Sequence, residues 1–195
     1  RQHAKRLNAN NVFTAYDFTQ LDDTWVKKHL AIVGIRLKHD LQGIKTLDLE
    51  VTQAKKTIAT TRSFETNYTK LEELQERIST FAVSCAEKLR KQHSCCNSLM
   101  VFIHTNGHRH DLPQYSRNIA VKLPYPTNSS IELTKFADLA LQRIFKNGYA
   151  YKKAGVVVQD FTPETDRQLN IFENSNPKHI PLMQTIDKLN TLYGQ

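Results

Sequence analysis

Leu99-Met100-Val101-Phe102-Ile103 is an unbroken apolar run whose length is typical of a buried β-strand. Before it, apolar residues over 71–89 recur every three or four positions and predict a long amphipathic helix. After it, apolar and polar side chains alternate over residues 118–123 and predict a half-exposed strand. A helix, a buried strand and a second strand therefore form the centre of the expected fold.

The pattern continues outward in both directions. Residues 56–64 are rich in threonine and other strand formers and predict a first strand. Ser129-Ser130 is suited to cap a second helix, and Val156-Val157-Val158 predicts a fourth strand. The order βαββαβ over residues 56–162 predicts an α+β fold, a four-stranded antiparallel sheet with two helices on one face. The other face of that sheet is open to a partner.

A helical region and a linker precede this unit. Residues 1–45 carry apolar side chains at mixed helical spacings, with N-cap signals at Thr14 and Asp22 and a turn signal at Gly34. They predict a small unit of several short helices. Residues 46–55 alternate polar and apolar side chains, and we interpret them as a linker along a domain surface or as a short strand.

The composition indicates a soluble protein with an acidic partner. The 195 residues carry a formal charge of +8 and are 39% hydrophobic, which is enough for a core. The sequence has no membrane-spanning run and no strongly basic amphipathic helix, so nucleic acid is favoured over a membrane surface. The three cysteines cannot pair completely and are expected to be reduced, which favours a cytoplasmic protein. Arg1 begins without a leader, and we interpret the chain as a fragment.

Several short segments carry a family resemblance in their order along the chain. They are SF at 63–64, LEEL at 71–74, ISTFA at 78–82, AEKLR at 86–90, VFIHTN at 101–106, PQYS at 113–116 and GYAYKKAGV at 148–156. With them the chain resembles the UmuC family, which are Y-family translesion DNA polymerases of bacteria. The resemblance implies that residues 1–45 are the remainder of the thumb and that residues 56–162 are the little finger, or polymerase-associated domain.

The resemblance also implies the activity of the parent protein, which is error-prone DNA synthesis in damage bypass and the SOS response. Two-metal catalysis needs several carboxylates around Mg²⁺, and in this family they belong to the palm, expected upstream of Arg1. Asp22-Asp23 and Glu72-Glu73 are adjacent pairs whose side chains diverge on a helix, and we interpret them as capping or solvated charges. We therefore expect no catalytic residue and no cofactor in this fragment, which is inactive alone.

A clamp-binding peptide is expected in the carboxyl-terminal extension, residues 163–195, together with a short helix. Gln168-Leu169-Asn170-Ile171-Phe172 looks like the peptide that bacterial DNA polymerases insert into the sliding clamp, with apolar anchors and one polar amide. The alternative is a loop that folds Leu169, Ile171 and Phe172 back onto its own domain. By resemblance, further partners are a UmuD-like accessory subunit and RecA.

Primer-template DNA is the main expected partner of the sheet. Its open face is suited to lie along the major groove and to hold phosphates without reading bases. The expected DNA-contacting residues lie on or beside the first, third and fourth strands: Thr60, Thr61, Arg62, Ser63, Arg117, Asn118, Lys122, Lys152 and Lys153. Alternation places Arg62 on the same face as Ile58 and Phe64, so we expect a bulge or bend if Arg62 is to reach DNA.

Two other hypotheses compete with these assignments. His104, His108 and His110 lie close to Asp111 in sequence, but their spacing matches no closed zinc pattern and favours solvated histidines. The alternative function is a free-standing ferredoxin-like module that binds RNA. Such a module stacks bases on sheet aromatics, and the alternation offers mainly Phe102 and Phe64 for this purpose.

Overall fold

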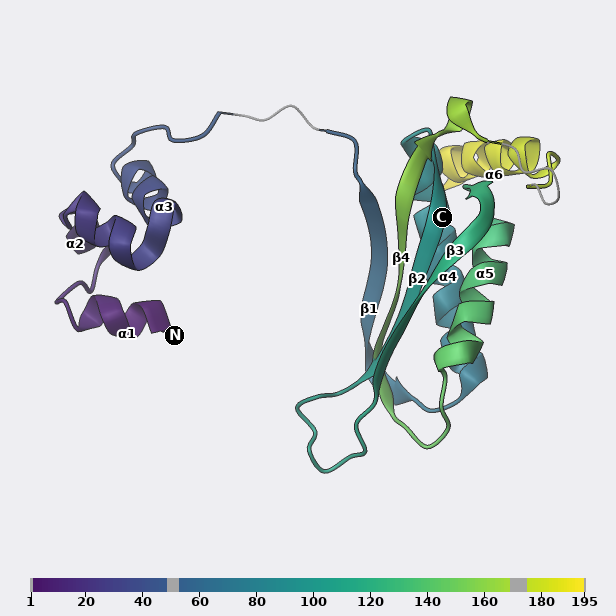
Figure 1. Ribbon diagram of the computed structural model, residues 1–195, viewed down its shortest axis with the longest axis horizontal. Coiled ribbons are helices and arrows are strands. Elements are labelled where there is room, and N and C mark those ends of the chain that lie inside the picture. The colour runs from purple at the N-terminus through teal and green to yellow at the C-terminus, as the bar shows by residue number, and fades with distance from the viewer. Residues whose placement is uncertain (1, 49–52, 169–174, 195) are drawn as a thin grey trace. The chain divides into compact units, whose positions relative to one another are not determined.

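The computed structural model describes residues 2–48, 53–168 and 175–194. The chain divides into two compact units, Arg1–Gln53 and Ala54–Gln195. As far as their residues are described, the first unit is helical and the second combines one sheet with helices (Figure 1).

The described residues of the first unit form three helices: α1 (Gln2–Asn8), α2 (Ala15–Thr19) and α3 (Asp23–Leu41). Thr14 caps α2 in a capping box, and the side chain of Asp22 caps α3 by accepting a 3.1 Å hydrogen bond from the Trp25 backbone N–H. Both predicted N-caps are therefore confirmed. The buried side chains Val12, Phe18 and Val26 form the small core.

The turn predicted at Gly34 is wrong, because Gly34 is buried within α3. A Cβ at this position would lie 2.4 Å from Leu30 Cβ and 3.0 Å from Val26 Cγ1, so glycine is required by close packing. The chain instead breaks its helical conformation at Ala31, where φ is 57° and ψ is −160°. Alanine is the strongest helix former, so the sequence carries no sign of this break.

The second unit contains the expected sheet. Its elements are β1 (Thr57–Tyr68), α4 (Leu71–Lys91), β2 (Ser94–Thr105), β3 (Ser116–Thr127), α5 (Ser130–Ile144), β4 (Tyr151–Pro163), η1 (Glu164–Asp166) and α6 (His179–Tyr193). The four strands pair antiparallel in the order β1-β4-β2-β3. The α+β fold class and the βαββαβ order are confirmed.

The core lies between the sheet and the helices α4 and α5, which cover one face (Figure 1). Leu74, Ile78 and Leu89 of α4 and Leu133 and Leu141 of α5 are fully buried. From the sheet, every second residue points into this core, and the list includes Ile58, Phe64, Leu99, Val101, Ile103, Leu123, Ala154, Val156 and Val158. Because side chains alternate between the two faces of a strand, the residues between these core positions point to the opposite face of the sheet.

The strands are longer than the sequence patterns that predicted them. The apolar run of residues 99–103 lies in the middle of the twelve-residue strand β2, and the valine run of residues 156–158 lies inside the thirteen-residue β4. Antiparallel pairing continues past the apolar centre, because β2 and β4 pair with each other from Ser94 and Pro163 to Thr105 and Tyr151. Lys152 and Lys153, which the valine run alone does not include, therefore lie within β4.

Candidate nucleic-acid interface

The open face of the sheet is built from four rows of side chains, one residue per strand in each row. In the order β1, β4, β2, β3 the rows are Thr57, Gln159, Ser98, Lys122; then Ala59, Val157, Met100, Ala120; then Thr61, Gly155, Phe102, Asn118; and last Ser63, Lys153, His104, Ser116. The outer rows are polar and each carries one lysine. The second row is apolar throughout and offers no side-chain hydrogen-bond donor or acceptor.

The Phe102 ring lies close against Gly155 in the third row. A Cβ on Gly155 would come within 2.6 Å of Phe102 Cε1 and Cζ and of Thr61 Cγ2. Glycine at this position therefore allows an aromatic ring to lie close against the sheet. His104 packs edge-on against the same ring, with 5.0 Å between the ring centroids.

Five of the nine predicted DNA-contacting residues lie on this open face. They occupy both ends of the face and its third row, and they are Thr61, Ser63, Asn118, Lys122 and Lys153. Neighbouring strands lie about 4.8 Å apart and residues rise about 3.3 Å along a strand. The rows of Lys122 and Lys153 are therefore about 20 Å apart along the strands.

The other four predicted residues do not share the open face. Thr60 lies on the helix side, where its hydroxyl accepts a 3.1 Å hydrogen bond from Lys88 Nζ. Arg62 pairs with Ala154 and Arg117 with Ile103, and both partners belong to the core face. Lys152 lies at a register shift, and its Nζ donates to the Glu65 carbonyl at 2.9 Å.

The bend expected near Arg62 is absent from the register. Pairing between β1 and β4 is regular from Thr57 to Ser63, and the irregularity comes only between Ser63 and Tyr68. Arg62 is nevertheless exposed, because the helices do not cover the edge strand at this point. Phe64 is buried against the helices, so of the two phenylalanines only Phe102 lies on the four rows of the open face, beside the His104 ring. The RNA-binding alternative therefore loses one of its two stacking rings.

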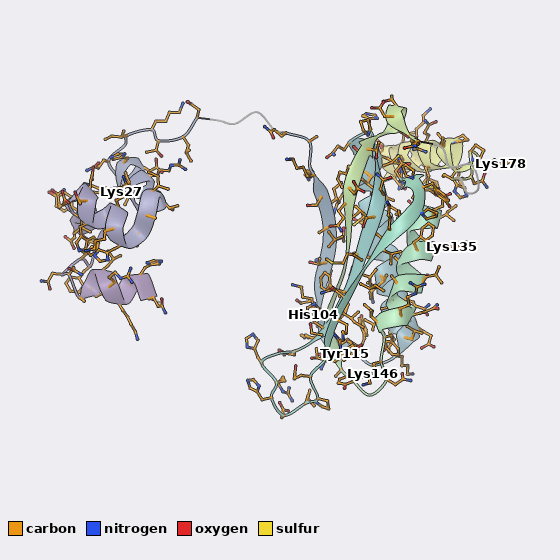
Figure 2. The ribbon with its side chains drawn as sticks, in the orientation of Figure 1. Lys27, His104, Tyr115, Lys135, Lys146 and Lys178 are labelled. Carbon is orange, nitrogen blue, oxygen red and sulfur yellow. The ribbon has the colours of Figure 1, made fainter. Side chains whose placement is uncertain are left out.

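One end of the face carries His104, which Figure 2 places beside the base of the long loop between β2 and β3. His104 Nδ1 and Ser116 Oγ lie 2.9 Å apart. Partial burial, and then the positive charge of Lys153, lower the pKa of His104. His104 is consequently neutral at neutral pH, and Lys153 supplies the positive charge of this row.

The loop between β2 and β3 is held by its own polar contacts. Arg109 donates two hydrogen bonds to Asp111, of 2.8 and 2.6 Å, and these bonds lower the pKa of Asp111 to about 2. Gln114 donates to the Arg109 carbonyl at 2.7 Å and closes the loop. The charge of Arg109 is therefore matched within the loop, which makes it a weaker candidate for phosphate contact than Lys122.

The cysteines have no reactive environment. Cys85, Cys95 and Cys96 are free and buried. Burial raises the pKa of the Cys95 thiol to about 11 and raises that of Cys96 further still. Within residues 2–48, 53–168 and 175–194, no three His, Cys, Asp or Glu side chains gather so as to hold a metal ion.

A network of buried polar groups at the start of α5 was not predicted from the sequence. The carboxylate of Glu132 is buried and accepts hydrogen bonds from Thr127 and from Ser175, Asn176 and His179 of the carboxyl-terminal segment. The donors lie up to 47 residues away in sequence, so no local sequence pattern predicts these hydrogen bonds.

Only the first residue of the clamp-like peptide, Gln168, is described by the structure, and it is exposed. The rest of the peptide, residues 169–172, lies outside the described residues.

The chain matches the family model described as the impB/mucB/samB family C-terminal domain over residues 55–171. This range contains the whole sheet and both covering helices. The chain belongs to the impB/mucB/samB family, and the resemblance expected from the short sequence segments is confirmed.

Similar proteins span the whole chain. Protein UmuC of Salmonella typhimurium strain LT2 is 34% identical over 100% of this chain and 47% of its own length. Protein ImpB of Salmonella typhimurium is 32% identical over 95% of the chain, and Protein MucB of Escherichia coli is 31% identical over 95%. The chain spans less than half the length of these relatives. Among the helices that the structure describes, none combines the length and the apolar character needed to cross a membrane.

Proposed function

We propose that this chain is the DNA-gripping and clamp-tethering part of an error-prone translesion DNA polymerase. The observation that carries the proposal is the open face of the sheet, with a lysine in each outer row. Lys122 and Lys153 lie in rows about 20 Å apart along the strands. The major groove is about 12 Å wide, so two cations in rows about 20 Å apart are spaced widely enough to lie on opposite sides of the groove.

The second row of the same face favours binding without sequence readout. Base recognition in the major groove depends on donors and acceptors that match base edges. The second row, which runs from Ala59 through Val157 and Met100 to Ala120, has no such side-chain groups. A polymerase that copies damaged templates slides over any sequence, and a face that holds phosphates alone serves that purpose.

In this proposal, the catalytic residues belong to another part of the parent protein. The adjacent acidic pairs are engaged in structural contacts: Asp22 caps α3, Asp23 pairs with Lys38 at 2.6 Å, and Glu73 accepts from the Thr69 and Lys70 backbone. The parent is then a DNA-directed DNA polymerase with Mg²⁺ in its palm, and residues 1–45 and 56–162 are its thumb remainder and little finger. It works in the cytoplasm during damage bypass and the SOS response.

The clamp tether is the second part of the proposal. The exposed side chain of Gln168 and the composition of Gln168–Phe172 support docking on a bacterial sliding clamp. The resemblance to the UmuC family adds a UmuD-like accessory subunit and RecA as proposed partners.

The proposal is tested by binding to fluorescent primer-template duplexes of unrelated sequence at several salt concentrations. Phosphate contacts give equal affinities for the different sequences and a log-log salt slope of about −0.9 for each neutralised phosphate. Strong preference for one sequence, or affinity that does not respond to salt, would refute the DNA grip. A single-stranded RNA of matched length serves as the comparison, and tighter binding to it would favour the RNA-binding alternative.

A further inference from the structure

Gly155 lies on the open face of the sheet and is buried although it has no side chain. The Phe102 ring and the Thr61 methyl group cover it, since Phe102 Cε1 and Cζ and Thr61 Cγ2 each lie 2.6 Å from the place that a Cβ would take. The ring therefore extends from β2 onto the neighbouring strand β4, and glycine is the residue that makes room for it. Phe102 itself stays partly exposed.

The neighbours of the Phe102 ring support it and place polar groups beside it. His104 packs against the ring with 5.0 Å between the centroids and 84° between the ring planes. Thr61 and Asn118, which lie in the same row as Phe102, are exposed. The Asn118 amide carries two donors and one acceptor, so it is able to meet the edge of any base.

The charge beside the ring suits a phosphate. Lys153 is exposed and lies two residues from Gly155 on β4, which is about 7 Å along the strand. None of the residues in the four rows of the open face is acidic. A nucleotide over Phe102 would therefore meet a cation on this face and no carboxylate.

An aromatic ring next to a cation is the arrangement on which proteins stack a nucleobase while they hold its backbone. In a fully paired duplex the bases stack on one another and present only their edges to a protein in the groove. A base is free to cover the Phe102 ring only when it is unpaired and out of the stack. Stacking tolerates every sequence because each base has a π-face, which agrees with the lack of readout in the second row.

We propose that Phe102, supported by Gly155, is a stacking platform for one unpaired base of the DNA that the open face holds. The inference rests on the DNA grip of the proposed function and adds a preference for DNA with an unpaired base. Such a base belongs either to the template overhang or to a nucleotide without a partner inside the duplex. The platform contributes affinity through stacking, whereas the lysines of the outer rows contribute the salt-dependent part.

The test compares fluorescent primer-template duplexes that carry equal numbers of phosphates. In one duplex of each pair an unpaired nucleotide has its base, and in the other the same nucleotide is abasic. One pair has this nucleotide as a one-nucleotide template overhang and the second pair has it inside the duplex, which separates the two sources. The chain is used unaltered, with Phe102→Leu, and with Tyr193→Leu as the matched control, because Tyr193 is an 84% exposed aromatic residue of α6, outside the sheet.

In the unaltered chain the base is expected to tighten binding by about 5-fold or more in at least one of the two pairs. Phe102→Leu should remove this difference and leave the affinity for the abasic duplexes and the salt slope unchanged, while Tyr193→Leu should retain it. Thermal unfolding checks that Phe102→Leu is folded, and Phe102→Met replaces it if it is not.

Two results would overturn the platform and leave the DNA grip intact. One is equal affinity of the unaltered chain for the base-containing and abasic duplexes in both pairs. The other is an effect of the base that persists in the folded Phe102 variant. Absence of binding to all of the duplexes would overturn the DNA grip itself, and the platform with it.

Discussion

Replacement of Gly155 by alanine tests how the open face is built. The new Cβ would lie 2.6 Å from two atoms of the Phe102 ring and from Thr61 Cγ2. Carbon atoms in favourable contact are about 3.5–4.0 Å apart, so the overlap is about 1 Å on both sides. Phe102 has to leave its position across the sheet. Overpacking of this kind costs about 1–3 kcal/mol, and we expect Gly155→Ala to lower the free energy of unfolding by that amount.

The assay is thermal and urea unfolding of the chain, with Gly107→Ala as the control. Nothing lies within 4 Å of a Cβ at Gly107, so this variant should unfold like the unaltered chain. A loss of 1–3 kcal/mol corresponds to a fall in melting temperature of roughly 2–4 °C for each kcal/mol in domains of 150–250 residues, and more in smaller ones. Adding Phe102→Ala to Gly155→Ala should make the two effects non-additive by about 0.5 kcal/mol or more. Equal stability of the Gly155 and Gly107 variants would refute the packing argument.

Three further outcomes are expected. Cys85, Cys95 and Cys96 should resist iodoacetamide at pH 8 until the chain unfolds, because burial raises their thiol pKa values and keeps the thiolate scarce; rapid labelling of the folded chain would contradict this. The purified chain should add no nucleotide to a primer with Mg²⁺ or Mn²⁺, and polymerisation that copurifies with it would show that the chain itself supplies catalytic carboxylates. Gln168→Ala with Phe172→Ala should weaken clamp binding in calorimetry by about 2 kcal/mol or more, and full affinity in the folded double variant would favour the alternative in which these residues pack on their own domain.

Periodicity predicted the centre of the fold well, because burial imposes a period of two on strands and of about 3.6 on helices. The apolar stripe of residues 71–89 became α4, and the alternation that placed Phe64 and Arg62 on one face was right. The strand ends were missed because they carry neither an apolar run nor an alternation, whether they are exposed, as residues 65–67 of β1 are, or buried, as residues 94–96 of β2 are. Their strand conformation comes from pairing with a neighbour that is distant in sequence.

The candidate site was predicted only in part for the same reason. Residue types predicted Asn118 and Lys122 as phosphate contacts, but only the register shows that Lys153 shares their face while Arg117 does not. The close packing of Phe102 depends on Gly155, which belongs to another strand. The Glu132 network joins segments more than 40 residues apart, and no single-sequence pattern encodes such a contact.

The central claim is that the open face, and not the helix side, grips duplex DNA. The most direct measurement is the salt slope of primer-template binding for Lys122→Ala with Lys153→Ala, compared with Arg62→Ala. All three side chains are basic, but the register places only the two lysines on the open face. We expect the slope to fall by about one for each lysine removed and to stay unchanged for Arg62→Ala. A slope that is unchanged in the lysine double variant and reduced by Arg62→Ala would contradict the account.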